Sequence, residues 1–115
     1  MPFKFSRCLC LQYPQRDKVV EFYRQVMGLE LAKQEFNNVE LKADPFRLFF
    51  DQGPLMGPIM EFYVPDLEQA KQELVKAGCQ ILRWEGKGGC CYVKDPFGFV
   101  FNLWEEPEAF KKLKT

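Results

Sequence analysis

The chain has no histidine among its 115 residues. Histidine is the base of the common catalytic triads and a frequent ligand of zinc. Its absence therefore excludes a histidine-based triad, a histidine general base and every histidine-containing metal site. Any chemistry in this chain must rely on carboxylates, thiols, tyrosines or lysines.

A membrane-spanning run, a signal peptide and a large basic cluster are also lacking. No stretch approaches the roughly 18 consecutive apolar residues of a membrane helix, and Met1–Phe5 has no apolar signal-peptide core. We therefore expect a cytoplasmic protein whose five cysteines, an odd number, are reduced thiols. Basic and acidic residues balance, 16 against 16, and only Lys111–Lys114 groups lysines. Neither a membrane nor nucleic acid is an expected partner.

Apolar and aromatic side chains, in contrast, are plentiful. Hydrophobic residues make up 47% of the chain, and phenylalanine occurs 12 times. This is enough for a hydrophobic core, and the length allows one domain. Twelve phenylalanines exceed what a core of this size usually needs, so we expect some of them to line a cavity or a subunit interface.

An internal repeat divides the chain into two halves. Residues 43–51 and 94–102 both place Asp-Pro-Phe ahead of an apolar run, and they lie about 50 residues apart. Gly28 and Gly78 recur at nearly the same spacing. The two halves are therefore predicted to share one layout.

Each half is predicted to contain one strand, one helix and three further strands. The fold class is then α+β, with two βαβββ modules at residues 1–53 and 58–106 and a tail with a short helix at 107–115. The strands predicted after each helix are 29–34, 38–42 and 46–51 in module one, and 79–84, 89–94 and 98–104 in module two.

Apolar residues at helical spacing predict the two helices. In module one these residues are Val19, Phe22, Tyr23, Val26 and Met27. In module two they are Leu67, Ala70, Leu74 and Ala77, with Asp66 as the N-cap. Gly28 and Gly78 suit the left-handed residue that ends a helix. The tail is expected to be anchored by Phe110 and Leu113.

Three motifs resemble a known superfamily. Val20–Leu29 resembles its first-helix signature, Phe62–Ala70 resembles its second strand-to-helix entry, and Asp95–Glu105 resembles its closing strand. All three occur in order over nearly the whole chain. The sequence thus resembles the glyoxalase/bleomycin resistance/extradiol dioxygenase, or vicinal oxygen chelate, superfamily. The resemblance implies that each module curls its sheet and that the two modules form a groove.

Members of that superfamily take metal ligands from the first and last strands of each module. The resemblance carries these positions to Cys8, Asp51, Ile59 and Asn102, where His, Glu or Gln is usual. Because isoleucine has no donor and asparagine is a weak neutral one, we expect no metal and no cofactor. A typical metal-dependent glyoxalase I or extradiol dioxygenase activity is not expected either.

Alternation along the strands indicates which side chains face the groove. On the last strand, Val100, Asn102 and Trp104 are expected to face it, and Phe97, Phe99, Phe101 and Leu103 are expected to pack under the helices. Phe49 and Asp51 of the fourth strand are expected to face it with Ile59, Glu61 and Tyr63 of the fifth.

One hypothesis for function is a metal-independent, homodimeric binding protein that holds a hydrophobic or aromatic small molecule in the groove. Aromatic side chains would supply stacking surfaces, and a few polar groups would orient the ligand. The candidate ligand-binding residues are Cys8, Phe49, Asp51, Ile59, Glu61, Tyr63, Trp84, Tyr92, Asn102 and Trp104.

Two other hypotheses stay open at the level of sequence. The chain could be a metal-independent lyase or isomerase in which Glu61 or Asp51 acts as general base, if the groove removes water from that carboxylate. It could also be a structural or regulatory protein that presents aromatic side chains to another protein.

Overall fold

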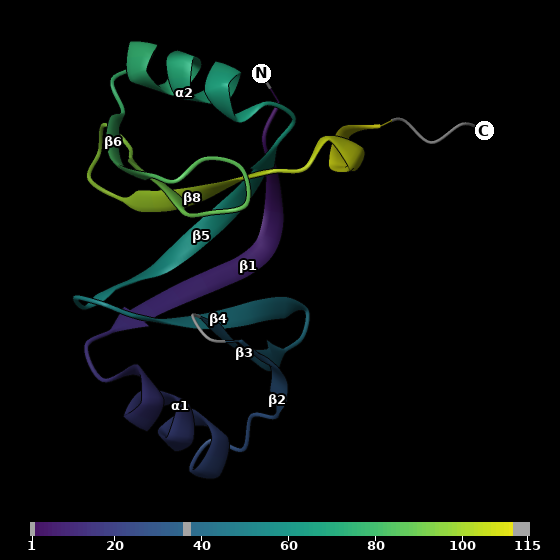
Figure 1. Ribbon diagram of the computed structural model, residues 1–115, viewed down its shortest axis with the longest axis vertical. Helices are drawn as coiled ribbons and strands as arrows, with labels where there is room; N and C mark the ends of the chain where they lie inside the picture. The colour runs from purple at the N-terminus through teal and green to yellow at the C-terminus, as the bar shows by residue number, and fades with distance from the viewer. Residues whose placement is uncertain (1, 36–37, 112–115) are drawn as a thin grey trace. The chain divides into compact units, whose positions relative to one another are not determined.

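The computed structural model describes residues 2–35 and 38–111 (Figure 1). The chain separates into two compact units. The N-terminal unit is Arg7–Met60, and the C-terminal unit combines Met1–Ser6 with Glu61–Thr115. The division runs through two strands, β1 (Lys4–Tyr13) and β5 (Met56–Val64), so each of these strands contributes residues to both units.

Each unit contains one α-helix and three strands of its own. The N-terminal unit holds α1 (Arg16–Gln25), β2 (Leu31–Glu35), β3 (Asn38–Ala43) and β4 (Phe46–Gln52). The C-terminal unit holds α2 (Leu67–Lys76), β6 (Gln80–Trp84), β7 (Cys91–Lys94) and β8 (Val100–Glu105), followed by one 3-10 turn at Pro107–Phe110. The predicted α+β fold class is confirmed, and the bounds differ from those predicted by one or two residues in most elements.

In the N-terminal unit the strands lie in the order β2-β3-β4-β1. β1 runs parallel to β4, whereas β2, β3 and β4 pair antiparallel. One face of this sheet packs under α1, and its core consists of Val20, Val39, Leu41 and Phe50. Tyr23 of α1 meets the Phe50 ring edge-on, with 5.0 Å between ring centroids.

The apolar stripe predicted for α1 is only partly correct. Val19 and Tyr23 do pack against the core, but Phe22, Val26 and Met27 are exposed. Val26 and Met27 lie beyond Gln25, the last residue of the helix, so the helical period no longer directs them toward the sheet. The predicted left-handed residue is present, since Gly28 has a φ of 77°.

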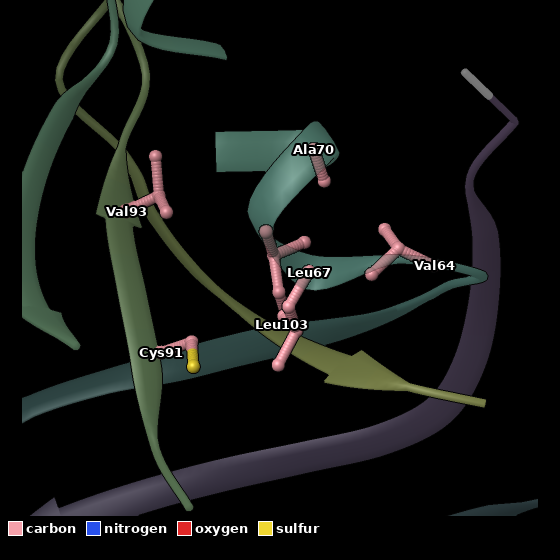
Figure 2. Packing of buried hydrophobic residues seen from close by; sticks show 6 residues of the cluster. All are labelled: Val64, Leu67, Ala70, Cys91, Val93 and Leu103. Atoms are coloured by element: carbon pink, nitrogen blue, oxygen red, sulfur yellow. The ribbon is translucent and has the colours of Figure 1, made fainter. Parts of the chain in front are cut away.

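In the C-terminal unit the strands lie in the order β5-β8-β7-β6, and α2 covers one face of them. The buried cluster joins Leu67 and Ala70 of α2 to side chains from three strands, namely Val64, Cys91, Val93 and Leu103 (Figure 2). Asp66 is the N-cap as predicted, because its Oδ1 accepts a hydrogen bond from the Gln69 N–H at 3.0 Å. Ala77 is exposed at the C-cap instead of extending the stripe.

A side chain from the end of the last strand accepts the first N–H of the helix in each unit. The Arg16 N–H of α1 donates to Gln52 Oε1 at 3.1 Å, and the Leu67 N–H of α2 donates to Glu105 Oε1 at 3.2 Å. The first N–H groups of a helix have no partner within it. These two side chains therefore tie each helix to the strand that closes its unit.

The start of β8 differs from the prediction. Phe101 and Leu103 pack under α2 as predicted, but Phe97 and Phe99 are 88% and 77% exposed. Both precede Val100, where the strand begins. Asp95 Oδ1 accepts hydrogen bonds from the Phe97 and Phe99 N–H groups, which makes a tight turn there and removes both residues from the alternation of the strand.

The predicted tail helix is a single 3-10 turn at Pro107–Phe110. Its expected anchor Leu113 lies outside the described residues. Most of the lysine group Lys111–Lys114 lies outside them as well. Within residues 2–35 and 38–111, no helix has the length and apolar character needed to cross a membrane.

Candidate functional site

The sheet face opposite α2 gathers predicted site residues of the C-terminal unit. Tyr92 and Asn102 are partners across β7 and β8, so they share this face. Val64 and Leu103 are buried on the other face, and alternation turns their neighbours Tyr63 and Trp104 away from α2. We call the set formed by Glu61, Tyr63, Tyr92, Asn102 and Trp104 the open face of the C-terminal unit.

Asn102 connects two parts of this open face. Its Oδ1 accepts a hydrogen bond from the Cys91 N–H at 2.8 Å, and its Nδ2 donates to Glu61 Oε2 at 3.3 Å. An amide can do both, because it carries a donor and an acceptor. A carboxylate at the same position could accept from Cys91 but would repel Glu61. Asn102 therefore organises β5, β7 and β8 through its side chain.

Arg83 forms the edge of the open face. It is the partner of Tyr92 across β6 and β7, and its guanidinium lies 5.9 Å from the Tyr92 ring centroid. Both its Nε and Nη2 donate to Glu85, whose other oxygen accepts the Cys90 N–H at 2.8 Å. The Cys90 N–H first and Arg83 second hold the pKa of Glu85 below its usual value. Tyr92 is only 4% exposed, so little of its ring is accessible at this edge.

Trp84 does not join the open face. It is the partner of Cys91, a residue of the buried cluster, and Lys71 of α2 lies 5.0 Å from its ring centroid. The cause is a β-bulge between Ile81 and Arg83. One extra residue shifts the two-residue period, so Trp84 lies on the α2 side and Arg83 on the open side.

The N-terminal unit has a corresponding face opposite α1. Across β1 and β4, Cys8 is the partner of Arg47 and Cys10 is the partner of Phe49, so these side chains share one face. Asp51 lies on it as well, and the Cys10 thiol donates to Asp51 Oδ2 at 3.4 Å. The structure therefore groups the predicted Cys8, Phe49 and Asp51 with Cys10, which the sequence did not single out as a ligand contact.

Glu40 and Arg47 on this face were missed by sequence reasoning. Arg47 donates to both oxygens of Glu40, each at 2.9 Å, and its guanidinium lies 5.1 Å from the Phe49 ring centroid. Arg47 holds the pKa of Glu40 below its usual value, mainly through this hydrogen bonding. In the sequence, this ion pair is visible only as opposite charges on neighbouring predicted strands. Recognising it as a pair requires knowledge of the register between β3 and β4.

Two cavities lie in the N-terminal unit. A small one of about 50 Å³ adjoins the ion pair and is lined by Lys33, Glu35, Asn38, Glu40, Arg47 and Phe49. The buried Asn38 Oδ1 has no hydrogen-bond partner in the described part of the chain. A larger groove of about 690 Å³ lies between α1 and β2–β3 and includes none of the predicted site residues.

The residues at the four superfamily metal positions do not fit a divalent metal. Ile59 is a hydrocarbon side chain that is 1% exposed, and the Asn102 carbonyl already accepts the Cys91 N–H. Cys8 and Asp51 remain as one thiol and one carboxylate, a mixed pair that no common site uses. Among residues 2–35 and 38–111, no three Cys, Asp or Glu side chains group so as to hold a metal ion.

The family follows from a comparison with known domains. The model of the glyoxalase-like domain matches residues 8–104. The chain belongs to this glyoxalase-like family. No curated protein sequence matches the chain. Solved structures agree on the vicinal oxygen chelate fold that was predicted from the three motifs.

Three of these solved structures illustrate the range of similarity. A hypothetical protein from Bacillus halodurans C-125 has a TM-score of 0.65 at 15% identity, with 100% of both chains covered. A superfamily member from Vibrio splendidus 12B01 has a TM-score of 0.60 at 18% identity, covering 91% of this chain and 98% of that one. A variant of homoprotocatechuate 2,3-dioxygenase from B. fuscum has a TM-score of 0.64 at 23% identity. That match covers 90% of this chain but 33% of the dioxygenase, so this chain spans about one third of its length.

Proposed function

We propose that this glyoxalase-like protein binds a hydrophobic or aromatic small molecule on its open sheet faces, without a metal. The carrying observation is the arrangement of Asn102, which occupies a superfamily metal position. Its side chain holds a backbone N–H and the Glu61 carboxylate, so it serves as a structural bridge. A ligand at this face would meet fixed polar groups and aromatic rings, the usual lining of a small-molecule site.

The aromatic residues of the open face support the class of ligand. Tyr63 of β5 and Trp104 of β8 are half-buried on this side of the sheet, whereas Tyr92 of β7 is buried and offers little accessible surface. Aromatic rings bind planar apolar molecules through offset or edge-to-face contacts. In the N-terminal unit, Phe49 with Arg47 above it offers a second surface of the same kind.

The two tryptophans provide a matched test of this proposal. Trp104 lies on the open face and Trp84 lies on the α2 side. The variant Trp84→Phe leaves Trp104 as the only reporter, and Trp104→Phe leaves Trp84. We expect 8-anilinonaphthalene-1-sulfonate, a planar aromatic probe, to quench the fluorescence of Trp104 and to leave that of Trp84 nearly unchanged.

Titration of both variants with and without EDTA checks the two parts of the proposal separately. Equal affinity under the two conditions supports metal-independent binding, whereas loss of binding with EDTA contradicts it. Quenching of Trp84 alone, or of neither tryptophan, would reject the open face as the binding surface.

Glu61 is the candidate general base if the protein is instead a metal-independent lyase or isomerase. Its carboxylate accepts a hydrogen bond from Asn102, which fixes its position on the open face. Glu61→Gln keeps the shape of the side chain and removes its basicity. If the protein only binds, this variant should keep probe affinity within about threefold, which is less than 1 kcal/mol. Proton exchange at a carbon next to a carbonyl that disappears in this variant would favour the enzyme.

We also propose that the protein is cytoplasmic and homodimeric. Five free cysteines suit a reducing compartment. Several large apolar side chains are exposed, among them Phe97 and Phe99, and such surfaces commonly mark an interface. Mass measurement under native conditions tests the dimer, and fractionation of the source cells tests the location.

A further inference from the structure

The larger groove of the N-terminal unit lies on the α1 side of the sheet, opposite the face that carries Arg47. Its volume of about 690 Å³ is typical of small-molecule sites. Val20 of α1 and Val39 of β3 line it and are buried in the N-terminal cluster, and Leu29 and Leu31 are half-buried beside them. The groove therefore has an apolar base. We call it the α1 groove.

The edge strands of the two units differ at one equivalent position. β2 and β6 each end the strand order of their unit, and each contains a β-bulge. After the bulge, Gln34 of β2 is the partner of Val39, and Trp84 of β6 is the partner of Cys91. Val39 is buried under α1 and Cys91 is buried under α2. Gln34 therefore takes the place in the N-terminal unit that Trp84 takes in the C-terminal unit.

Trp84 shows what packs at this position in the C-terminal unit. Its ring lies against the buried cluster under α2, and the Lys71 ammonium is 5.0 Å from the ring centroid. Gln34 has no ring, is exposed and lines the α1 groove. The α1 groove thus lies where an aromatic ring packs in the other unit. A planar aromatic molecule about the size of an indole is the class of ligand that such a surface suits.

The charges that line the α1 groove favour a cation. The charged lining residues are three acids, Asp17, Glu21 and Glu30, and one base, Arg24. Asp17 and Glu30 form ion pairs with basic residues outside the groove. Glu21 forms no ion pair with the residues that the structure describes, so its carboxylate is left for a ligand. Arg24 lies about one turn further along α1, and a guanidinium can stack on an aromatic ring.

We propose that the α1 groove is a binding site for a planar aromatic molecule that carries a protonated amine. The ring packs on the apolar base beside Gln34, as the ring of Trp84 packs in the C-terminal unit. The ammonium meets the Glu21 carboxylate, and this charge complementarity selects cations over anions. The site is separate from the open sheet faces of the proposed function, because α1 covers the other side of the N-terminal sheet.

Tryptamine tests the proposal, because it joins an indole ring to an ammonium group. Indole-3-acetate carries a carboxylate on the same ring and is the matched probe of opposite charge. Isothermal titration calorimetry should detect tryptamine binding at submillimolar to millimolar concentration, and indole-3-acetate should bind at least about fivefold more weakly. Absence of tryptamine binding at millimolar concentration, or equal binding of the two probes, would overturn the proposal.

Filling the α1 groove locates the site. Gln34→Trp supplies the ring that Trp84 supplies in the other unit, so it should weaken tryptamine binding at least about tenfold. The matched control is Lys33→Trp. Lys33 is the partner of Glu40, which lies on the opposite face of the sheet, so this variant should bind tryptamine like wild type. Far-UV circular dichroism checks that both variants are folded. Unchanged binding by folded Gln34→Trp, or equal loss in both variants, would overturn the site.

Glu21→Gln tests the charge without filling the α1 groove. It should weaken tryptamine binding about threefold to fivefold and leave indole-3-acetate binding nearly unchanged. Glu68→Gln, which removes an exposed carboxylate of α2, is the matched control and should bind like wild type. Equal tryptamine affinity in Glu21→Gln and wild type would contradict the role of Glu21 and with it the proposal.

The α1 groove and the open face can fail independently of each other. In the Trp84→Phe background, quenching of Trp104 by 8-anilinonaphthalene-1-sulfonate reports the open face of the C-terminal unit. Glu21→Gln should leave this quenching unchanged while it weakens tryptamine binding. Loss of both signals in Glu21→Gln would show that tryptamine does not have a site of its own and would overturn the inference.

Discussion

At the scale of single residues, Asn102 illustrates how a side chain can exchange one role for another at a fixed place in a fold. The resemblance to the vicinal oxygen chelate superfamily places one of its metal-ligand positions at this residue of β8. Here the amide satisfies the Cys91 N–H and orients Glu61. A buried backbone N–H without a partner is costly, so the bridge also supports the sheet.

Replacing Asn102 should therefore cost stability. We expect Asn102→Ala to lower the free energy of unfolding by about 1–3 kcal/mol, because the Cys91 N–H and the Glu61 carboxylate both lose a partner. Urea titration followed by circular dichroism measures the loss. Asn102→Asp restores the acceptor but places a second carboxylate beside Glu61. Its deficit should shrink as the pH falls toward about 4, where carboxylates gain protons. Wild-type stability in Asn102→Ala would contradict the structural role.

At the scale of strands and helices, prediction from sequence succeeded where the elements are regular. The alternation of β8 correctly buried Phe101 and Leu103, and the capping pattern correctly identified Asp66. Trp84, a candidate ligand contact, lies on the α2 side, because the bulge in β6 adds one residue and reverses the sides that follow. No residue type in β6 indicates this bulge.

Whether a candidate site residue could be predicted from the sequence also depended on strand register. Asp51 and Asn102 could be placed on an open face from alternation alone. Glu40 could not be recognised as the partner of Arg47, because the pair forms only when β3 and β4 align with Lys42 opposite Arg47 and Glu40 opposite Phe49. Phe97 and Phe99 were assigned to the core because the turn made by Asp95 is a side-chain effect that the apolar pattern does not contain.

The ion pair between β3 and β4 predicts a pH dependence. Arg47 lowers the pKa of Glu40 in the folded protein, so the pair stabilises the fold above the unfolded pKa of about 4.3 and is lost as the pH falls through the lower folded pKa. Arg47→Met, which keeps much of the packing on Phe49, should cost about 1 kcal/mol at pH 7, since the Arg47 side chain is half exposed.

Urea titrations of wild type and Arg47→Met over a series of pH values measure this effect. The difference between the two proteins should be constant at neutral pH and close in the acid range. Glu40→Gln alone and with Arg47→Met completes a double-mutant cycle. A difference that persists unchanged into acid would show that packing, not charge, explains the loss.

At the scale of the whole molecule, two hydrophobic clusters are connected by shared strands. Each unit has its own core, but β1 and β5 contribute residues to both units. Unfolding of one unit therefore releases strand residues that the other unit uses. We expect the two clusters to unfold in one cooperative transition.

The loss of stability caused by a substitution in one unit should accordingly be measurable in the other unit. Leu41→Ala removes a fully buried side chain from the N-terminal cluster and should cost about 2–5 kcal/mol. Both tryptophans, Trp84 and Trp104, lie in the C-terminal unit. Their fluorescence should report the same lowered midpoint as far-UV circular dichroism. An unchanged tryptophan transition beside a shifted circular dichroism transition would mean that the units unfold separately.

The side chains that accept the first N–H of each helix have a consequence for biosynthesis. Gln52 lies 36 residues after Arg16, and Glu105 lies 38 residues after Leu67. Because a ribosome synthesises the chain from its N-terminus, each helix is made before the side chain that accepts its first N–H. The nascent protein can thus complete the N-terminal contact of α1 only after β4 has been made, and that of α2 only after β8 has been made.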